Sequence, residues 1–188
     1  SASTIVYQPG VSPSPEYAIV DTYIGTYGDE RNINYCMNAV HLLRNNDYRA
    51  SLFQFPLTGI PQGAVIESAT LSLYADSRTN TAGITVSAHR LLREWSPCWA
   101  NWVKASATTS WGVMGANDLV SDRSDAADDI VVISAAPAWV NLNVTNMVQA
   151  WALDPSSNKG IVIKTHAGAN VQYAIRSDNH SQANTRPR

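Results

Sequence analysis

The residues of this chain that could bind a metal ion are aspartates gathered in one short stretch. Asp118, Asp122 and Asp125 lie close together in sequence, and Asp21 lies at the mouth of a predicted strand. Calcium prefers carboxylate oxygens, and several of them must converge on one ion. The stretch predicts either a structural calcium site, with Asp21 as a second candidate, or a solvated acidic loop. No other cofactor is expected.

Tryptophans form a second group with possible binding chemistry. Trp95, Trp99, Trp102 and Trp111 lie in one segment of the chain. Flat aromatic faces stack on sugar rings, so exposed neighbours would make a platform for a glycan. Trp99 and Trp111 are the candidates for such a platform.

The two cysteines, Cys36 and Cys98, allow a single pairing. In an oxidising compartment a disulfide between them would close a long loop and contribute roughly 4 kcal/mol in the chain-entropy model. The alternative is two separately buried thiols, because free cysteine packs well as a small apolar side chain. Their spacing does not resemble that of a zinc site.

Residues for catalysis are scattered. The four histidines lie in separate segments, and the serine-hydrolase, zinc-protease and phosphate-loop motifs are absent. Paired carboxylates of the glycosidase type are also not indicated, since the glutamates lie far apart in the sequence. These histidines and glutamates are His41, His89, His166, His180, Glu16, Glu30, Glu67 and Glu94. The sequence therefore predicts a protein that is not an enzyme.

Composition favours one exported domain. The chain has 188 residues, a formal net charge of −2 and 15% charged residues. A nearly neutral surface excludes nucleic acid and anionic membranes as electrostatic partners. No apolar run approaches the roughly 20 residues of a membrane-spanning helix. We therefore expect an extracellular or cell-surface location.

Alternation of apolar and polar residues with a period of two dominates the chain and predicts strands. One segment is helical by pattern: Asn143 or Thr145 can cap it, and Asp154-Pro155 ends it. Many short strands with Gly and Pro turns are typical of a β-sandwich or jelly roll. The predicted strands are 17–24, 50–55, 65–74, 84–91, 130–133, 139–142, 160–164 and 171–175.

An ordered series of motifs resembles the DNRLRE domains, which are similar to the carbohydrate-binding modules of family 96. The series is Arg49–Gly63, Ile66–Tyr74, Asp21-Thr22-Tyr23, Glu94-Trp95, Asn143-Val144-Thr145 with Val148–Trp151, Asn158-Lys159-Gly160, and the closing Ser177 to Pro187. The resemblance implies a secreted or cell-surface jelly-roll β-sandwich, with polysaccharide binding in some relatives. It also implies that Trp95 and Trp102 belong to the core.

The two ends of the chain depart from that resemblance. DNRLRE domains carry a last strand just after their Arg-Pro step, and here that strand is absent. Thr4, Ile5, Val6 and Tyr7 have the character of such a strand at the other end. We therefore divide the chain into an N-terminal donor strand (1–8), a Pro/Ser linker (9–16) and a sandwich (17–188).

These features predict an all-β jelly-roll sandwich with one short helix, completed by a donated N-terminal strand. A sandwich that lacks a strand exposes unpaired backbone groups, and an inserted strand supplies the missing hydrogen bonds. The expected function is that of an extracellular subunit that assembles head-to-tail with itself into a filament. The alternative is a carbohydrate-binding module that recognises a polysaccharide as a monomer or within a larger surface protein.

Overall fold

The computed structural model describes residues 2–188, and it shows the all-β fold that the alternating sequence predicts. Nine strands pair antiparallel, and the described residues contain one α-helix, α1 (Thr145–Leu153). The strands are β1 (Val20–Gly25), β2 (Val40–Arg44), β3 (Arg49–Gln54), β4 (Thr70–Arg78), β5 (Ile84–Arg90), β6 (Asp129–Ile133), β7 (Ala138–Asn143), β8 (Ile161–Thr165) and β9 (Gln172–Arg176).

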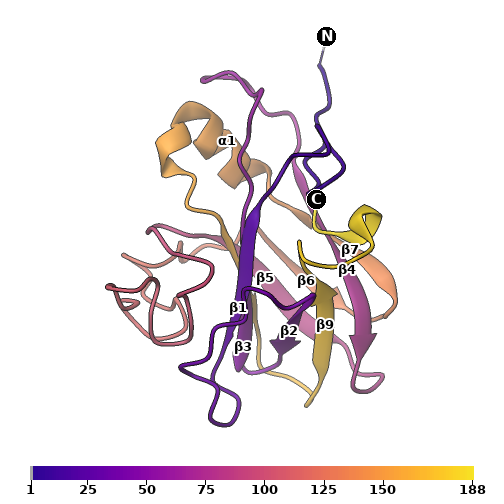
Figure 1. Ribbon diagram of the computed structural model, residues 1–188, viewed down its shortest axis with the longest axis vertical. Coiled ribbons are helices and arrows are strands. Elements are labelled where there is room, and N and C mark those ends of the chain that lie inside the picture. The colour runs from indigo at the N-terminus through magenta and orange to yellow at the C-terminus, as the bar shows by residue number, and fades with distance from the viewer. Residues whose placement is uncertain (1) are drawn as a thin grey trace.

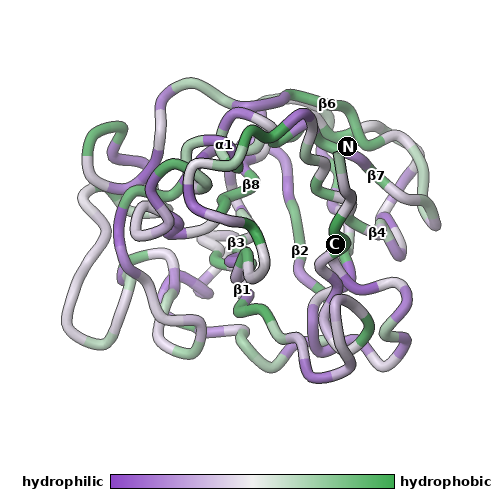
Figure 2. The backbone as a smooth tube through the Cα atoms, turned by 90° about the horizontal axis from the view of Figure 1, so that it is seen from above, coloured by the Kyte–Doolittle hydropathy of each residue, from purple (hydrophilic) through white to green (hydrophobic). Residues whose placement is uncertain are grey.

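The sheet folds into two facing halves. Its strand order is β6-β5-β8-β3-β2-β9-β4-β7, with β1 on the free side of β3. β2 and β3 pair only at Arg44 and Arg49, so the sheet divides there. One half is β1-β3-β8-β5-β6 and the other is β2-β9-β4-β7. Figure 1 shows the strands from the side, and Figure 2 places β3 and β8 opposite β4 and β7.

The main hydrophobic core lies between these halves. Phe53 and Ile163 from one half meet Leu73 and Tyr173 from the other, and all four are buried. Each such side chain contributes about 2 kcal/mol by leaving water. Because strand side chains alternate between faces, the neighbours of Phe53 and Ile163 point away from this core.

A second core covers the outer face of β3 and β8. Leu52 and Val162 face outward there and pack against Trp95, Trp102 and Trp111 from the loops after β5. The indole N–H of Trp95 donates to the Lys159 carbonyl at 2.7 Å. β8 therefore has a core on each of its faces, which agrees with the burial of all five of its residues.

Two segments differ from the predicted elements. β2 was not expected, because Val40–Arg44 shows little alternation, yet His41 and Leu43 point inward. Residues 4–7, expected as a strand, form none. The helix lies where it was predicted, but its N-cap residue is Val144, which makes no side-chain cap. Asp128 supplies a capping acceptor from a distant loop, since its carboxylate accepts the Met147 N–H at 2.8 Å.

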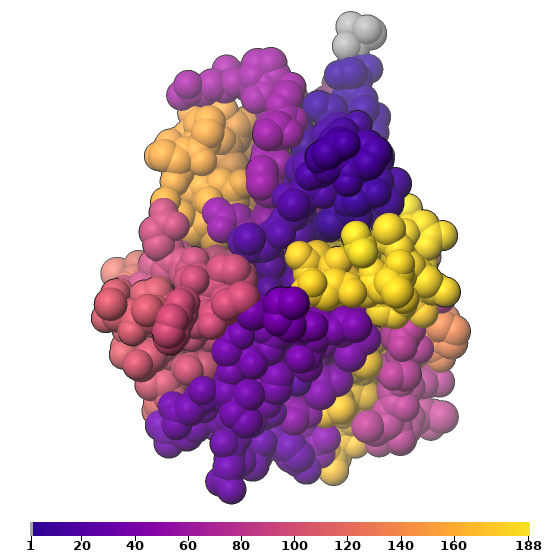
Figure 3. Space-filling model, in the orientation of Figure 1, coloured from indigo at the N-terminus to yellow at the C-terminus, as the bar shows by residue number. Residues whose placement is uncertain are grey.

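The first and last segments pack against each other at one end of the molecule, seen in Figure 3 as indigo beside yellow. The predicted linker is a compact turn here, closed by a bridge between Gln8 and Ser12. The Gln8 side chain donates to the Arg186 carbonyl at 3.0 Å. Arg188 then pairs with Ser72 of β4 through two backbone hydrogen bonds of 2.7 and 3.1 Å.

Candidate functional site

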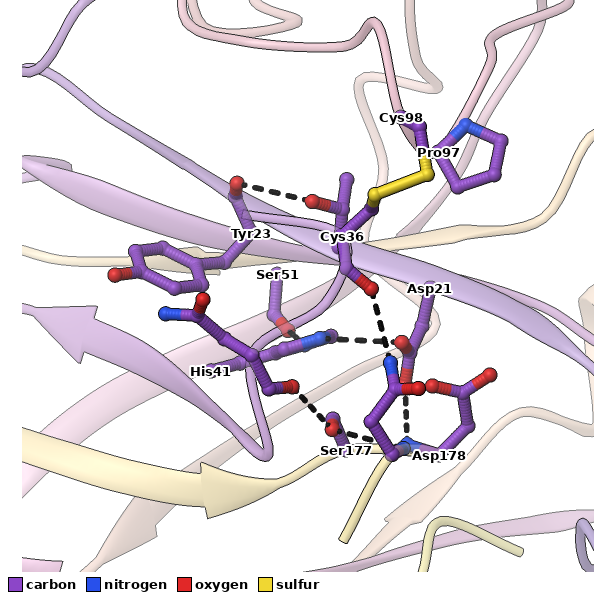
Figure 4. Close-up of polar contacts among 12 residues, drawn as sticks. Asp21, Tyr23, Cys36, His41, Ser51, Pro97, Cys98, Ser177 and Asp178 are labelled. Atoms are coloured by element: carbon purple, nitrogen blue, oxygen red, sulfur yellow. Dashed lines mark hydrogen bonds and ion pairs between the residues drawn. A yellow bond between two sulfur atoms is a disulfide. The ribbon is translucent and has the colours of Figure 1, made fainter. Parts of the chain in front are cut away.

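Three polar side chains from neighbouring strands meet inside the sandwich (Figure 4). His41 of β2 lies between Ser51 of β3 and Asp21 of β1. Its Nδ1 contacts the Ser51 hydroxyl, and its Nε2 lies 3.3 Å from Asp21 Oδ1. Strand alternation turns Ser51 inward together with Phe53. In space, the serine contacts the histidine and the histidine contacts the aspartate. This line of contacts resembles the arrangement that activates a serine nucleophile in hydrolases.

Burial leaves no room for a substrate at this cluster. Ser51, His41 and Asp21 are 0%, 1% and 2% exposed. A nucleophile acts only where a substrate can reach it. Asp21, a candidate calcium ligand by sequence, instead pairs with His41 and accepts the backbone N–H of Asp178 at 2.9 Å.

Asp178, in the loop after β9, forms a carboxyl pair with Asp21. Burial and the neighbouring Asp21 carboxylate raise the pKa of Asp178 to about 8. Burial acts to raise the pKa of Asp21 as well, but the His41 imidazole and hydrogen bonds from Asp178 outweigh it and leave that pKa below its usual value. Two adjacent carboxylates do not both ionise readily. The pair therefore favours a state in which the two carboxyl groups hold one proton between them.

The cluster joins the C-terminal loop to the segment before β2. The Ser177 hydroxyl donates to the Asn38 carbonyl at 2.6 Å, and the Asn179 amide donates to the Cys36 carbonyl at 2.9 Å. Cys36 is bonded to Cys98, with their Cα atoms 5.0 Å apart, so the disulfide is formed. The polar cluster is thus a structural joint between β1, β2, the C-terminal loop and the loops after β5.

The aspartates of the acidic loop make hydrogen bonds within the loop. Asp122 is fully buried, and its carboxylate accepts the N–H groups of Gly112, Val113 and Asp118 at 2.9 to 3.1 Å. Asp118 accepts two further N–H groups, whereas Asp125 is exposed. Within residues 2–188 no group of three or more His, Cys, Asp or Glu side chains is placed to hold a metal ion. The loop is ordered by its own amides and by Arg93, whose guanidinium lies 3.2 Å from Asp122 Oδ1.

The tryptophans do not form a platform. Trp111 is 5% exposed, and its indole N–H donates to the Asn101 carbonyl at 2.8 Å. Trp99 is 61% exposed, and the other three tryptophans of this segment are buried. Trp95 and Trp102 are buried, as expected. The sequence separates these residues poorly, because all four lie in one loop region and only tertiary packing decides which turn inward.

A groove of about 640 Å³ opens beside the first residues of β4. We call it the β4 groove. One wall is residues 3–7, and the other is residues 64–72. Its floor is apolar and consists of Phe55, Val148, Trp151 and Ile161. No sequence motif marks the groove, because its lining comes from five separate segments of the chain.

The N-terminal wall of the groove is lightly attached. The Tyr7 hydroxyl donates to the Thr58 carbonyl at 2.5 Å, and the Tyr7 ring packs against Tyr17 with centroids 5.4 Å apart. Ile5 and Val6 are exposed. Thr4 to Tyr7 therefore line a groove on their own molecule and pair with no strand of it.

The comparison with protein families assigns the chain. The TGF-beta propeptide model matches residues 26–186. This chain belongs to the TGF-beta propeptide family. No curated protein matches it. The part shared with other TGF-beta propeptides includes β2 to β9 and α1, and it leaves out β1 and the N-terminal wall of the β4 groove.

Membership of the TGF-beta propeptide family corrects the resemblance to DNRLRE domains and family 96 carbohydrate-binding modules. Alternating strands with Gly and Pro turns are common to many β-sandwiches, so the motif series reflects the architecture more than descent. The predicted filament subunit and the alternative carbohydrate-binding module are both wrong. The same finding overturns the expected partners, a second copy in a homopolymer and a polysaccharide, and with them the role of Thr4 to Tyr7 as a donor strand.

The family match agrees with the expected location. TGF-beta propeptides are secreted proteins, which agrees with the predicted extracellular location. Within residues 2–188 no helix is both long and apolar enough to cross a membrane.

Proposed function

We propose that this chain acts outside the cell as a non-enzymatic propeptide domain that binds a growth-factor polypeptide. Family membership supports the class of partner, since the propeptide family takes its name from TGF-beta. The partner is therefore another protein, and neither a sugar nor a nucleic acid.

The β4 groove is the observation that carries this proposal. It is an open concave surface with an apolar floor, the kind of site at which proteins bind other polypeptides. Val65 stands in its wall and is 84% exposed. A large apolar side chain held in water at the rim of an apolar groove is suited to a protein contact.

The buried polar cluster supports a role without catalysis. Ser51 is the one serine of the described chain in a hydrolase-like contact with a histidine and an aspartate, and it has no access to solvent. The cluster holds strands and a loop in place, and this structural role is sufficient in a binding domain.

Surface plasmon resonance against recombinant TGF-beta-family growth-factor dimers tests the proposal. We expect saturable binding by the whole chain. Val65→Asp should weaken it at least about tenfold, because a carboxylate is costly to desolvate against an apolar partner.

Val120→Asp is the matched control. Val120 is 88% exposed and lies in the acidic loop, outside the groove lining, so its substitution should leave affinity unchanged. Both variants should fold, since neither site is in a core. If the wild-type chain binds no member of the panel, the proposed function is wrong. If Val65→Asp and Val120→Asp lower the affinity equally, the β4 groove is not the binding site.

A further inference from the structure

We propose that Asn143 is a glycosylation site, at which an oligosaccharide is joined covalently to the side-chain nitrogen as the chain is exported. The donor is a sugar chain carried on a lipid diphosphate. This inference depends neither on the β4 groove nor on the growth-factor partner.

The sequence carries two triplets of the form Asn-x-Ser/Thr, the pattern that marks an acceptor asparagine in exported proteins. The first begins at Asn143 and the second at Asn179, and neither has proline in the middle. TGF-beta propeptides are secreted proteins, and a disulfide such as Cys36–Cys98 persists in an oxidising compartment. The chain therefore passes through the compartments in which such triplets are modified.

The side chain of Asn143 directs its nitrogen away from the fold. Asn143 is the last residue of β7 and is exposed. Its Oδ1 accepts the Thr145 N–H at 3.0 Å and the Thr145 hydroxyl at 2.7 Å. A backbone N–H can only donate, so these contacts fix which end of the amide is the oxygen. The Nδ2 atom makes no hydrogen bond within the described chain and is free to react.

The surface around Asn143 has room for a sugar chain. Strand alternation turns Asn143 outward together with Asn141, since Leu142 between them is buried in the main core. Thr70, the partner of Asn143 on β4, is exposed, and so is Asn146 in the first turn of α1. A glycan at Asn143 therefore extends into solvent and displaces no packed side chain.

The fold holds this triplet in place without using the Asn143 nitrogen. The Asn143 backbone N–H donates to the Asp129 carboxylate at 2.7 Å, and the Val144 N–H donates to the Ala69 carbonyl at 3.0 Å. The Thr145 hydroxyl accepts the Ala69 N–H at 3.0 Å. Modification of the side-chain nitrogen leaves all of these bonds intact.

The second triplet uses its nitrogen inside the molecule. Asn179 Nδ2 donates to the Cys36 carbonyl at 2.9 Å, in the joint between the C-terminal loop and the segment before β2. The Asn179 backbone N–H donates to the Ser177 hydroxyl at 3.1 Å. A sugar on Asn179 Nδ2 would stand against that joint, so we expect the folded chain to carry its glycan at Asn143 alone.

The reaction is a displacement at carbon. The Asn143 nitrogen attacks the anomeric carbon of the donor sugar, and a carbon–nitrogen bond forms. The carbon–oxygen bond to the lipid diphosphate breaks, and the diphosphate leaves with that electron pair. The nitrogen releases one of its two protons to solvent and keeps the other. Nothing is oxidised or reduced.

The whole chain, secreted from cultured animal cells behind an added signal peptide, tests the proposal. An amidase that cleaves the bond between glycan and asparagine should lower the mass of the wild-type protein by one glycan. It should leave a carboxylate at position 143, which mass spectrometry of peptides locates. A wild-type chain without a glycan, or with a glycan at Asn179, would overturn the proposal.

Variants of the two triplets separate them. Thr145→Ser keeps the hydroxyl and should keep the glycan, whereas Thr145→Val has nearly the same shape without the hydroxyl and should lose the glycan completely. Asn143→Gln should also lose it, and this variant retains the Thr145 hydroxyl as the acceptor for the Ala69 N–H.

Ser181→Ala is the control, because it destroys the second triplet at an exposed residue whose hydroxyl makes no hydrogen bond within the described chain. Its glycan should equal that of the wild type. A glycan that persists in Asn143→Gln, or one that is lost in Ser181→Ala, would contradict the assignment to Asn143.

Discussion

Asp178 and Asp21 share a proton inside the fold, and this links stability to pH. The pKa of Asp178 is raised to about 8, so the folded chain keeps a proton that the unfolded chain releases. The contribution of Asp178 to the free energy of unfolding is complete below the usual aspartate pKa of about 4 and declines as pH rises toward 8. The pKa of Asp21 is lowered, so its contribution to the free energy of unfolding depends on pH in the opposite direction. That contribution is present above the usual aspartate pKa and is lost as pH falls below it.

Asp178→Asn should remove the loss of stability that Asp178 causes as pH rises, because an amide imitates the protonated carboxyl group at every pH. We expect the difference in melting temperature, variant minus wild type, to rise by a few degrees between about pH 5 and about pH 8.5. Thermal unfolding followed by circular dichroism measures it. Asp76→Asn, which removes a half-buried carboxylate that is paired with Arg176 and has no neighbouring carboxylate partner in that ion pair, is the control and should give a flat difference. A flat curve for Asp178→Asn would show that Asp178 is ionised at neutral pH.

The residues of this cluster could be recognised only in part from the sequence. Ser51 and Asp21 each stand at an inward position of a predicted strand, which is a signal for a buried polar partner. Their partners His41 and Asp178 lie outside every predicted element. The pairing depends on how β2 and the C-terminal loop pack, and tertiary packing of that kind leaves no local pattern.

Among the elements, the loops after β5 depend most on a covalent bond. They carry few strand hydrogen bonds, and the Cys36–Cys98 disulfide ties them to the segment before β2 across a sequence separation of 62 residues. The Asn34 side chain adds hydrogen bonds to the Pro97 and Ala100 carbonyls. These contacts hold the outer core against β3 and β8.

Replacing both cysteines, Cys36→Ser with Cys98→Ser, should lower the free energy of unfolding by about 4 kcal/mol, because the unfolded chain loses a long closed loop. Urea titration followed by tryptophan emission measures this loss. Wild-type protein unfolded in a reducing buffer is the control and should match the double variant. A loss under about 1 kcal/mol would mean that the loop constrains the unfolded state little.

The strands and the helix were predictable because burial of one face imposes a period of two on a strand and a period near 3.6 on a helix. Eight predicted strands from the sandwich and the helix appear with shifted ends. β2 was not predicted, because apolar and polar residues alternate only weakly from Val40 to Arg44. Thr4 to Tyr7 were predicted as a strand and form none, because an alternating segment does not have to pair with another strand. The aspartates of the acidic loop accept hydrogen bonds from neighbouring amides, and composition alone does not distinguish that arrangement from metal binding.

On the scale of the whole molecule, stability should be unevenly distributed. β8 has the main core on one face and the tryptophan-rich core on the other, while residues 2–6 are exposed and belong to no strand. Regions with two-sided burial open only with global unfolding, and lightly attached segments exchange freely.

Native-state hydrogen exchange should reproduce this gradient. Amides of Ile161 to Thr165 should exchange with free energies near that of global unfolding, and amides of Ser3 to Val6 should exchange at nearly unprotected rates. β6, whose Ile130 and Val132 are exposed, should fall between them. Early exchange of β8 would show that the two cores unfold independently of each other.

The contact between Gln8 and Arg186 also has a mechanical consequence. The first and last described segments leave the molecule at the same end and hold each other by a side-chain hydrogen bond, with Arg188 bonded to Ser72. A pull on these two segments would act across those few bonds one after another, before any load reached the long ladders of β3 with β8 or β4 with β7. The ends would then part at low force while the sandwich stayed folded, and the β4 groove, whose N-terminal wall belongs to the pulled segment, would widen under tension.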